Sequence, residues 1–271
     1  MNLQVDIIVI GDSLSGHAVV NKLASANPMI KMVFISREFK STTTHDFLNV
    51  EYIKEEVVFT DYKNRLFGCY LNNGDRVYST HLVVASGLKY KPLIINNKEV
   101  PNVYNNADDI PKFAKNQPAV VLGSQNSDVK FALAVAKKYK QIYFCTENFG
   151  IDGITPANFK KLSEAKNIAV LPNTSIIKFV ASDGKLSKVD LSNYSTTTCS
   201  AIYVKTEARP ETDFISDKII SKDESGYLKT TNISQSLLVP KCFAIGNCAG
   251  KSTKKMQEAM IEAILNDFNR R

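Results

Sequence analysis

The chain has 271 residues, of which 44% are hydrophobic and 23% are charged, and a formal net charge of +7. This composition is typical of a globular protein with a full core, and no apolar run is long enough to cross a bilayer. The lysines are scattered and no basic stripe interleaves with aromatic residues, which argues against nucleic acid as a partner. The chain does not open on a signal-type segment, so we expect a cytoplasmic protein.

Cysteine and histidine are dispersed along the chain. None of the five cysteines forms a C-x-x-C pair, so the spacing predicts buried free thiols rather than a zinc site or a vicinal disulfide. His17, His45 and His81 are too far apart in sequence to indicate a metal cluster. We therefore expect no metal ion.

The first part of the chain alternates strand, helix and strand. A β-branched run over 5–10 stops at Gly11, and an apolar stripe over 18–26 predicts a helix that leads to a strand over 31–35. Asn72-Asn73-Gly74-Asp75 is typical of a hairpin turn. The runs around it predict an antiparallel meander with strands over 57–60, 65–71, 75–79 and 82–85.

Residues 92–118 are rich in Asn and Pro and predict a connection between domains. The alternation then restarts with a strand from Ala119, a helix that ends near Ala136 and further strands over 141–145, 168–171, 176–181, 188–191 and 201–205. A strand over 242–245 and a helix over 256–268 follow at the end of the chain. They lack a glycine turn of the same kind, so we expect them to join the sheet of the first domain.

Two segments of the chain resemble each other: VDIIVIGDSLSGHAVV from Val5 and PAVVLGSQNSDVKFAL from Pro118. Each is a strand that stops at a glycine, crosses a polar turn and enters a helix, as in a dinucleotide-binding unit. We therefore predict an α/β fold with two Rossmann-like, three-layer ββα domains, the second inserted into the first. The expected FAD-binding domain is 1–112 with 209–271, and the expected NAD(P)-binding-like domain is 113–208.

The order of these motifs resembles the low-molecular-weight thioredoxin reductase group of FAD- and NAD(P)-dependent pyridine nucleotide-disulfide oxidoreductases. VIGDSLSG is similar to the group's first FAD fingerprint, and SREFKSTTTHDFLN is similar to its ribose-contacting loop. TDYKNRLF followed by LVVASG resembles the meander and its closing strand. ARPET resembles the exit from the nucleotide domain, and CFAIGN resembles the C-terminal FAD motif.

The resemblance implies an FAD site in the first domain. It places Glu38 on the ribose, Asn49 near the flavin, Val57 near the adenine and Gln257 against the flavin ring. Ser13 stands where the family has a second glycine, and Asn247 stands where it has an aspartate. The implied cofactor-binding residues are Gly11, Ser13, Leu14, Ser15, Gly16, Glu38, Asn49, Val57, Gly87, Gly246, Asn247 and Gln257.

Two departures from the family bear on function. The stretch 102–108, where the family's redox C-x-x-C would fall, contains no cysteine. The pair of thiols that direct dithiol–disulfide exchange requires is therefore missing. The second fingerprint keeps only Gly123, while Gln125 crowds the pyrophosphate position and Asp128 can cap its own helix. Glu147 would repel the 2′-phosphate of NADPH but could bond the free ribose of NADH.

Three functions remain open. The first is an FAD-dependent oxidoreductase that passes electrons from NADH or another donor to a small-molecule or protein acceptor that is not a dithiol. The second is a flavin-binding sensor or interaction protein without turnover. The third is a structural relic with an empty cofactor site. No catalytic residue is identified. The resemblance alone implies a homodimer. We expect His17 at the surface, with a phosphate contact as the alternative, and Cys248 as a packed small residue, with a low-pKa thiol as the alternative.

Overall fold

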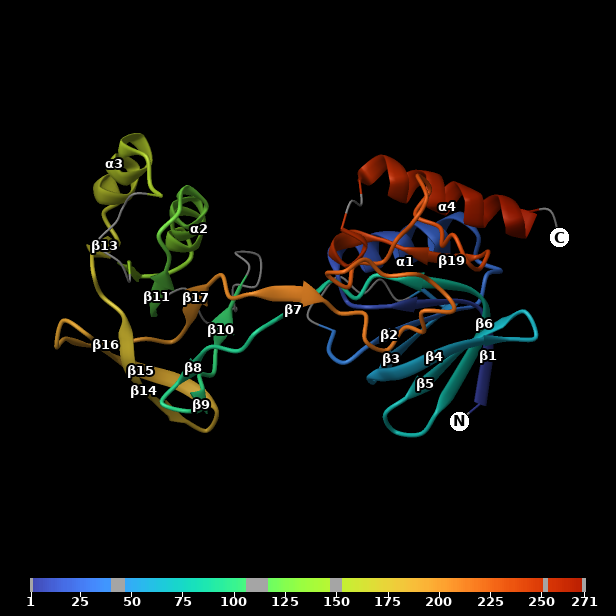
Figure 1. Ribbon diagram of the computed structural model, residues 1–271, viewed down its shortest axis with the longest axis horizontal. Helices are drawn as coiled ribbons and strands as arrows, with labels where there is room; N and C mark the ends of the chain where they lie inside the picture. Colours follow the sequence, from blue (N-terminus) through green and yellow to red (C-terminus); the bar gives the residue numbers. More distant parts are fainter. Residues whose placement is uncertain (1, 40–46, 106–116, 147–152, 251–252, 270–271) are drawn as a thin grey trace. The chain divides into compact units, whose positions relative to one another are not determined.

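The computed structural model describes residues 2–39, 47–105, 117–146, 153–250 and 253–269. The chain divides into two compact units, Met1–Lys89 with Ala208–Arg271 and Tyr90–Glu207 (Figure 1). The two crossings between the units, β7 (Leu88–Tyr90) and β18 (Ala208–Pro210), pair with each other. Residues 112 and 113, where the sequence predicts the start of the inserted domain, lie outside the described residues.

The first unit is built on a parallel sheet whose helices cover one face. Its strands, in spatial order, are β3 (Val50–Lys54), β2 (Met32–Ser36), β1 (Asn2–Ile10), β6 (Arg76–Val84) and β19 (Cys242–Ala244). The helices α1 (Leu14–Ala26) and α4 (Lys254–Asn269) pack on this sheet through a buried apolar cluster. The predicted return of the C-terminal strand and helix to the first domain is confirmed.

The opposite face of this sheet is covered by the antiparallel strands β4 (Val57–Lys63) and β5 (Leu66–Leu71) and by apolar side chains from the irregular segment 211–240. β6 serves both layers. Its first half pairs with β5, where Phe67 faces Ser79, and its second half pairs with β19, where Cys242 faces Leu82. The prediction of separate strands over 75–79 and 82–85 is therefore wrong, because Thr80 and His81 continue the strand.

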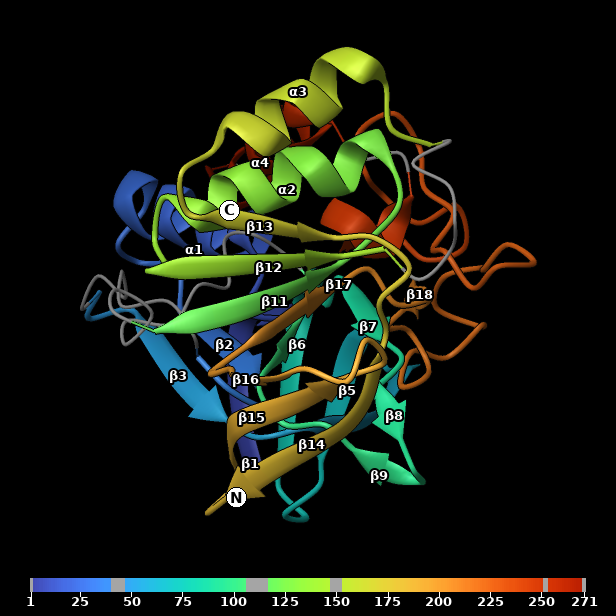
Figure 2. The same ribbon diagram turned by 90° about the vertical axis from the view of Figure 1, so that its left-hand side faces the viewer.

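The second unit repeats the arrangement of helices, parallel sheet and antiparallel strands (Figure 2). Its parallel strands, in spatial order, are β10 (Val103–Tyr104), β17 (Ile202–Val204), β11 (Pro118–Leu122), β12 (Gln141–Cys145) and β13 (Ile168–Leu171). One face carries α2 (Asn126–Ala136) and α3 (Pro156–Glu164). The other carries β14 (Ile176–Ser182), β15 (Lys185–Leu191) and β16 (Thr196–Thr198). The three-layer ββα fold predicted for each half is confirmed.

Several elements were not predicted. β3 is a strand of five residues in which the charged Glu51 and Lys54 are exposed. α3 is preceded by Thr155 and begins at Pro156, a typical helix start. The predicted connection over 92–118 contains the two-residue strands β8 (Ile94–Ile95) and β9 (Lys98–Glu99), besides β10. In the part of the chain that the structure describes, no helix has the length and apolarity to span a membrane.

Candidate dinucleotide site

The first glycine turn lies between the carboxyl end of β1 and the start of α1. Gly11 adopts a φ of +109°, and a Cβ there would collide with the backbone carbonyl of Ala85, just beyond β6. A Cβ at Gly16 would collide with the carbonyl oxygen of Gly11. Only glycine satisfies both contacts without moving the strand or the helix. The two glycines therefore fix the close strand–turn–helix connection that dinucleotide-binding turns use.

The amino end of α1 offers backbone hydrogen-bond donors. The Ser13 hydroxyl oxygen caps the helix by accepting a hydrogen bond from the Gly16 amide at 3.1 Å. The amides of Ser13, Leu14 and Ser15 donate to no acceptor within the described segments. The Leu14 side chain is 80% exposed. Unpaired amides at a helix amino terminus, assisted by the helix dipole, are a binding site for an anion such as pyrophosphate.

A buried ion pair lies in the same turn. The Asp12 carboxylate contacts Nε2 of His17, and both side chains are about nine-tenths buried. The His17 ring packs edge-on against Phe34, with the ring centroids 5.0 Å apart. The expectation of a surface histidine is therefore wrong, because the aromatic packing and the carboxylate draw His17 inward.

Two C-terminal segments meet the first turn. Gly246 begins η2 (Gly246–Ala249) with a φ of +73°, and a Cβ there would lie 3.0 Å from the Ser15 hydroxyl oxygen. The side-chain amide of Gln257, on α4, donates to the Ser15 carbonyl oxygen at 3.3 Å. Asn247 is exposed next to Gly246. The structure thus brings three segments that are distant in sequence to the carboxyl end of one parallel sheet, where α/β folds bind ligands.

Glu38 and Gly87 lie at the same edge of the sheet. Glu38 is exposed just beyond β2, and its carbonyl oxygen accepts a hydrogen bond from the Ser36 hydroxyl at 2.9 Å. Gly87 follows β6 with a φ of +76°, and its carbonyl oxygen accepts from the Glu211 amide at 3.1 Å. Since β2 and β6 both run parallel to β1, the ends of all three strands face the first turn.

Asn49 and Val57 are placed differently. Asn49 precedes β3 at the amino end of the sheet, and its side-chain amide donates to the Ile30 carbonyl oxygen at 2.9 Å. It therefore anchors the turn between α1 and β2, at the edge opposite Gly11, and the structure does not support the expected place near a flavin. The Val57 side chain is buried in the core, so only its backbone could contact an adenine.

The second glycine turn, between β11 and α2, has used its backbone donors. The Asp128 carboxylate accepts hydrogen bonds from the amides of Ser124 at 3.0 Å and Gln125 at 2.9 Å, which is the cap that the sequence predicts. The Asn126 amide donates to the Gly153 carbonyl oxygen, and the Gly123 amide donates to the Cys145 carbonyl oxygen.

Side chains also fill the space in front of α2. A Cβ at Gly123 would collide with the Asp128 side chain, and the Lys205 ammonium lies 3.4 Å from that carboxylate. The Asn126 side chain accepts hydrogen bonds from the Thr155 amide and the Asn158 amide group. The predicted NAD ribose contact Glu147 lies outside the described residues. The protein itself thus supplies the negative charge at this helix.

All five cysteines are buried as free thiols. Burial raises the pKa of Cys69 and Cys242, and it raises the pKa of Cys199 to about 12. Burial likewise raises the pKa of Cys248, although nearby backbone hydrogen bonds oppose the shift. The alternative of a low-pKa thiol at Cys248 is wrong, because desolvation outweighs the hydrogen bonds that oppose it. Cys248 packs as a small core residue.

Comparison with known proteins identifies the family. A family model described as pyridine nucleotide-disulphide oxidoreductase matches residues 37–246. The chain belongs to this family. The family's curated thioredoxin reductase from Chlamydia pneumoniae is 24% identical over 217 residues, which are 73% of this chain and 67% of that protein.

Solved structures agree with the family's fold. The thioredoxin reductase of Lactococcus lactis, in the form named FR conformation, matches with a TM-score of 0.65 and 16% identity over 98% of both chains. The thioredoxin reductase of T. acidophilum matches with a TM-score of 0.67 and 14% identity, again over 98% of both chains. At these identities the likeness shows a fold of two Rossmann-like domains.

Proposed function

We propose that the chain is an FAD-dependent oxidoreductase of the thioredoxin reductase-like group, with FAD held by the first unit. The observation that carries the proposal is the difference between the two glycine turns. In the first turn the amides of Ser13, Leu14 and Ser15 donate to no acceptor within the described segments. In the second turn the backbone amides already donate to the Asp128 carboxylate and to the Gly153 carbonyl oxygen. A pyrophosphate can replace water at the first turn, but at the second it would have to displace a carboxylate.

The residues of the first unit fit an FAD molecule. Gly11 and Gly16 hold the tight turn that brings the amino end of α1 to the pyrophosphate position, and Glu38 is exposed at the end of β2, where a ribose hydroxyl would bond. Asn247 offers an amide to the ribityl chain, and Gln257 lies beside the first turn. When bound, FAD supplies the electron-transfer chemistry, and the protein positions it and excludes competing reactions. The cofactor-binding residues that we carry forward are Gly11, Ser13, Leu14, Ser15, Gly16, Glu38, Val57, Gly87, Gly246, Asn247 and Gln257.

We propose that the NAD(P) site of the second unit is degenerate. NADPH is disfavoured further by Glu147, while NADH or another donor is compatible with the proposal. The acceptor is a small molecule or a protein that does not react through a dithiol on this chain. Single buried thiols with raised pKa values support this, since thiolate attack needs an accessible sulfur. A cytoplasmic homodimer remains part of the proposal.

The second candidate is a flavin-binding sensor or interaction protein without turnover. The specific observation in its favour is the closed second turn, because a protein that binds flavin but receives no hydride needs no second dinucleotide site. Both candidates require FAD. They differ in whether NADH or another electron donor can reduce the bound flavin.

The test uses the purified full-length chain and two matched glycine variants. Wild type should carry, or take up, FAD with visible flavin absorption. Gly16→Ala should lose FAD, because its Cβ collides with the Gly11 carbonyl, whereas Gly123→Ala should retain it, because the equivalent collision lies in the second unit. Anaerobic bleaching by NADH or by another biological electron donor supports the oxidoreductase, and a flavin that neither a reduced nicotinamide nor any other such donor bleaches supports the sensor. A folded wild type that never binds FAD would overturn both.

A further inference from the structure

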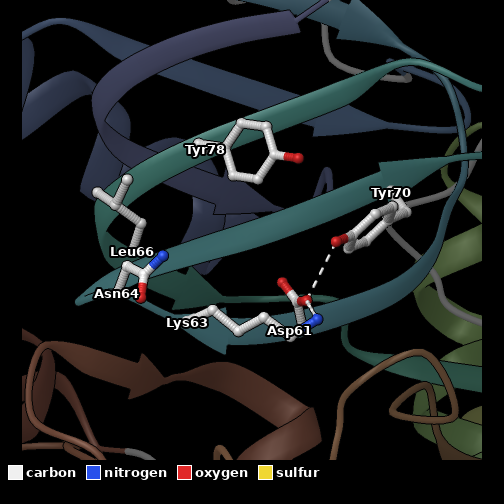
Figure 3. A pocket seen from close by; sticks show the side chains of 6 residues that line it. All are labelled: Asp61, Lys63, Asn64, Leu66, Tyr70 and Tyr78. Atoms are coloured by element: carbon white, nitrogen blue, oxygen red, sulfur yellow. Dashed lines mark hydrogen bonds and ion pairs between the residues drawn. The ribbon is translucent and has the colours of Figure 1, made fainter.

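The outer face of the meander carries a hollow that the dinucleotide site does not use. It has a volume of about 230 Å³ and is lined by six residues from β4, β5 and β6 and the turn between β4 and β5 (Figure 3). Those residues are Asp61, Lys63, Asn64, Leu66, Tyr70 and Tyr78. Ligand sites for drug-sized molecules measure roughly 300–1,000 Å³, so this hollow suits one chemical group rather than a whole cofactor.

The hollow follows from strand alternation and one glycine. Asp61 on β4 faces Gly68 on β5, and Gly68 faces Tyr78 on β6, so these residues form a row across three strands. Residues two apart on a strand share a face, which adds Tyr70 and Lys63 to the same side. Gly68 has no side chain, and the side chains of Asp61, Tyr78 and Tyr70 occupy the space above it. A Cβ there would collide with the Asp61 carboxylate and lie 3.2 Å from the Tyr78 ring.

The chemistry of the lining is that of a cation site. The Asp61 side chain is only 14% exposed and accepts a hydrogen bond from the Tyr70 hydroxyl at 3.0 Å. Burial, and then the bond to Asp61, raises the pKa of Tyr70, so the phenol stays a neutral donor. Tyr70 already holds a cation over its ring, since the Arg76 guanidinium carbon lies 5.5 Å from the ring centroid. Carboxylates and aromatic faces together attract organic cations.

The ammonium of Lys63 contacts the Asp61 carboxylate, where an organic cation would also bind. It lies 3.0 Å from the Asp61 carboxylate, although the Lys63 side chain is 77% exposed. The hydrogen bond and the charge of Asp61 raise the pKa of Lys63, so it remains charged. An exposed pair of this kind contributes little to stability and can be replaced by a better partner. Lys63 therefore occupies the position of the ligand without filling the hollow.

We propose that this hollow binds an alkylated ammonium group, held by the Asp61 carboxylate and the rings of Tyr70 and Tyr78 in place of Lys63. The alkyl groups lie against the two tyrosine rings. The group can belong to a free small molecule or to a methylated lysine side chain, since both present the same cation. Lys63 competes from within the chain, and Arg76 lowers affinity by repulsion, so we expect binding in the millimolar range.

The experiment follows tyrosine ring signals by NMR on the full-length protein with ring-labelled tyrosine. Tyr70→Phe and Tyr78→Phe assign the two resonances. Tetramethylammonium chloride should shift both signals saturably, while potassium chloride at equal ionic strength should not. Trimethyl-lysine, blocked as N-acetyl methylamide, is the second probe. Tighter binding of this probe identifies a side chain as the source of the cation, and equal or weaker binding identifies a free small molecule.

Three variants distinguish a binding site from a structural ion pair. Asp61→Asn should weaken binding by about tenfold or more, because it removes the charge but keeps the shape. Lys63→Gln should tighten binding by about 1.4- to 5-fold, because it removes an exposed cation that competes with the ligand. Asp183→Asn, which removes a carboxylate from a hairpin turn of the second unit, is the control and should change nothing.

Several results would overturn the proposal. The first is that the tyrosine signals of the folded wild type show no saturable shift. The second is that Asp61→Asn binds the ammonium probe as tightly as wild type, and the third is that Lys63→Gln binds it more weakly. Saturable binding of inorganic phosphate in place of the ammonium probes would also overturn it, because Lys63 and Arg76 would then be the binding groups. None of these outcomes depends on FAD, so the proposal stands apart from the proposed enzymatic function.

Discussion

The closed second turn predicts that Asp128 stabilises the inserted unit in the absence of any nucleotide. The perturbation is Asp128→Ala, which removes the carboxylate that accepts the amides of Ser124 and Gln125. The side chain is about nine-tenths buried, so water replaces it poorly. Asp128→Asn keeps a carbonyl oxygen in nearly the same position and removes only the charge. The two variants separate the hydrogen bonds from the electrostatic contribution.

The expected cost follows from the contacts. Loss of a helix cap costs about 1 kcal/mol, and hydrogen bonds to a charged group contribute about 1.5–3 kcal/mol. The Lys205 pair adds about 0.5 kcal/mol or less, because Lys205 is half exposed. We expect a free energy of unfolding lower by about 2–3 kcal/mol in Asp128→Ala and by about 1 kcal/mol in Asp128→Asn. For a domain of this size the larger loss lowers Tm by about 6–12 °C.

Thermal unfolding followed by circular dichroism measures this loss, and amide hydrogen exchange assigns it to the start of α2. The control is Ser127→Ala, which removes an exposed hydroxyl that lies 3.3 Å from the other Asp128 oxygen. This variant should change the free energy of unfolding by about 0.5 kcal/mol or less. If Asp128→Ala is as stable as Ser127→Ala, the carboxylate does not cap the turn and the contrast between the two turns fails.

Two further predictions concern pH and thiol chemistry. Burial opposes ionisation of Asp267, but the bond and charge of Lys241 at 2.7 Å and the contact with His81 at 2.9 Å hold its pKa below the usual value. A carboxyl with a lowered pKa stabilises the fold above its unfolded pKa and loses this effect as the pH falls through the folded pKa. Asp267→Asn should therefore lower the free energy of unfolding by about 0.5–1 kcal/mol at neutral pH and by progressively less below about pH 4. Urea titrations at several pH values measure this difference, and a difference that does not change with pH would contradict the ion pairs. All five thiols should resist a disulfide reagent in the native protein and react once it is unfolded, and rapid native formation of an intrachain disulfide would contradict the non-dithiol acceptor.

The fold could be predicted from the sequence because its strongest motifs are local. The β-branched runs that stop at Gly11 and Gly123 specify strand, turn and helix within a few residues, and the structure has both. β6 was divided in two because Thr80 and His81 interrupt an apolar pattern. In the structure the Ser79 hydroxyl bonds to the His81 carbonyl oxygen, and His81 contacts Asp267 on α4. The long-range contact between His81 and Asp267 cannot be inferred from local spacing.

The candidate site was predicted in part. The meeting of Gly246 and Gln257 with the first turn agrees with the placing implied by the family resemblance. The pairing of Asp12 with His17 was missed, although their five-residue spacing around the helix start could have suggested it. Asn49 was misplaced because the sequence does not show which edge of the sheet a loop residue reaches. The cation hollow depends on cross-strand register around Gly68, which local pattern does not fix.

The self-capped turn of the second unit has a consequence for how the two units respond to cofactor supply. A ligand that binds only the folded protein stabilises it by RT ln(1 + L/Kd), where L is the free ligand concentration, so the gain in stability rises with the logarithm of that concentration. Under the proposed function, the inserted unit, whose turn is satisfied by its own carboxylate, would gain nothing from nucleotide abundance. The first unit, with free amides, would be protected from proteolysis when flavin is plentiful and exposed to it under flavin starvation. The resistance of the first unit to proteolysis would then depend on the flavin concentration, while that of the inserted unit would not.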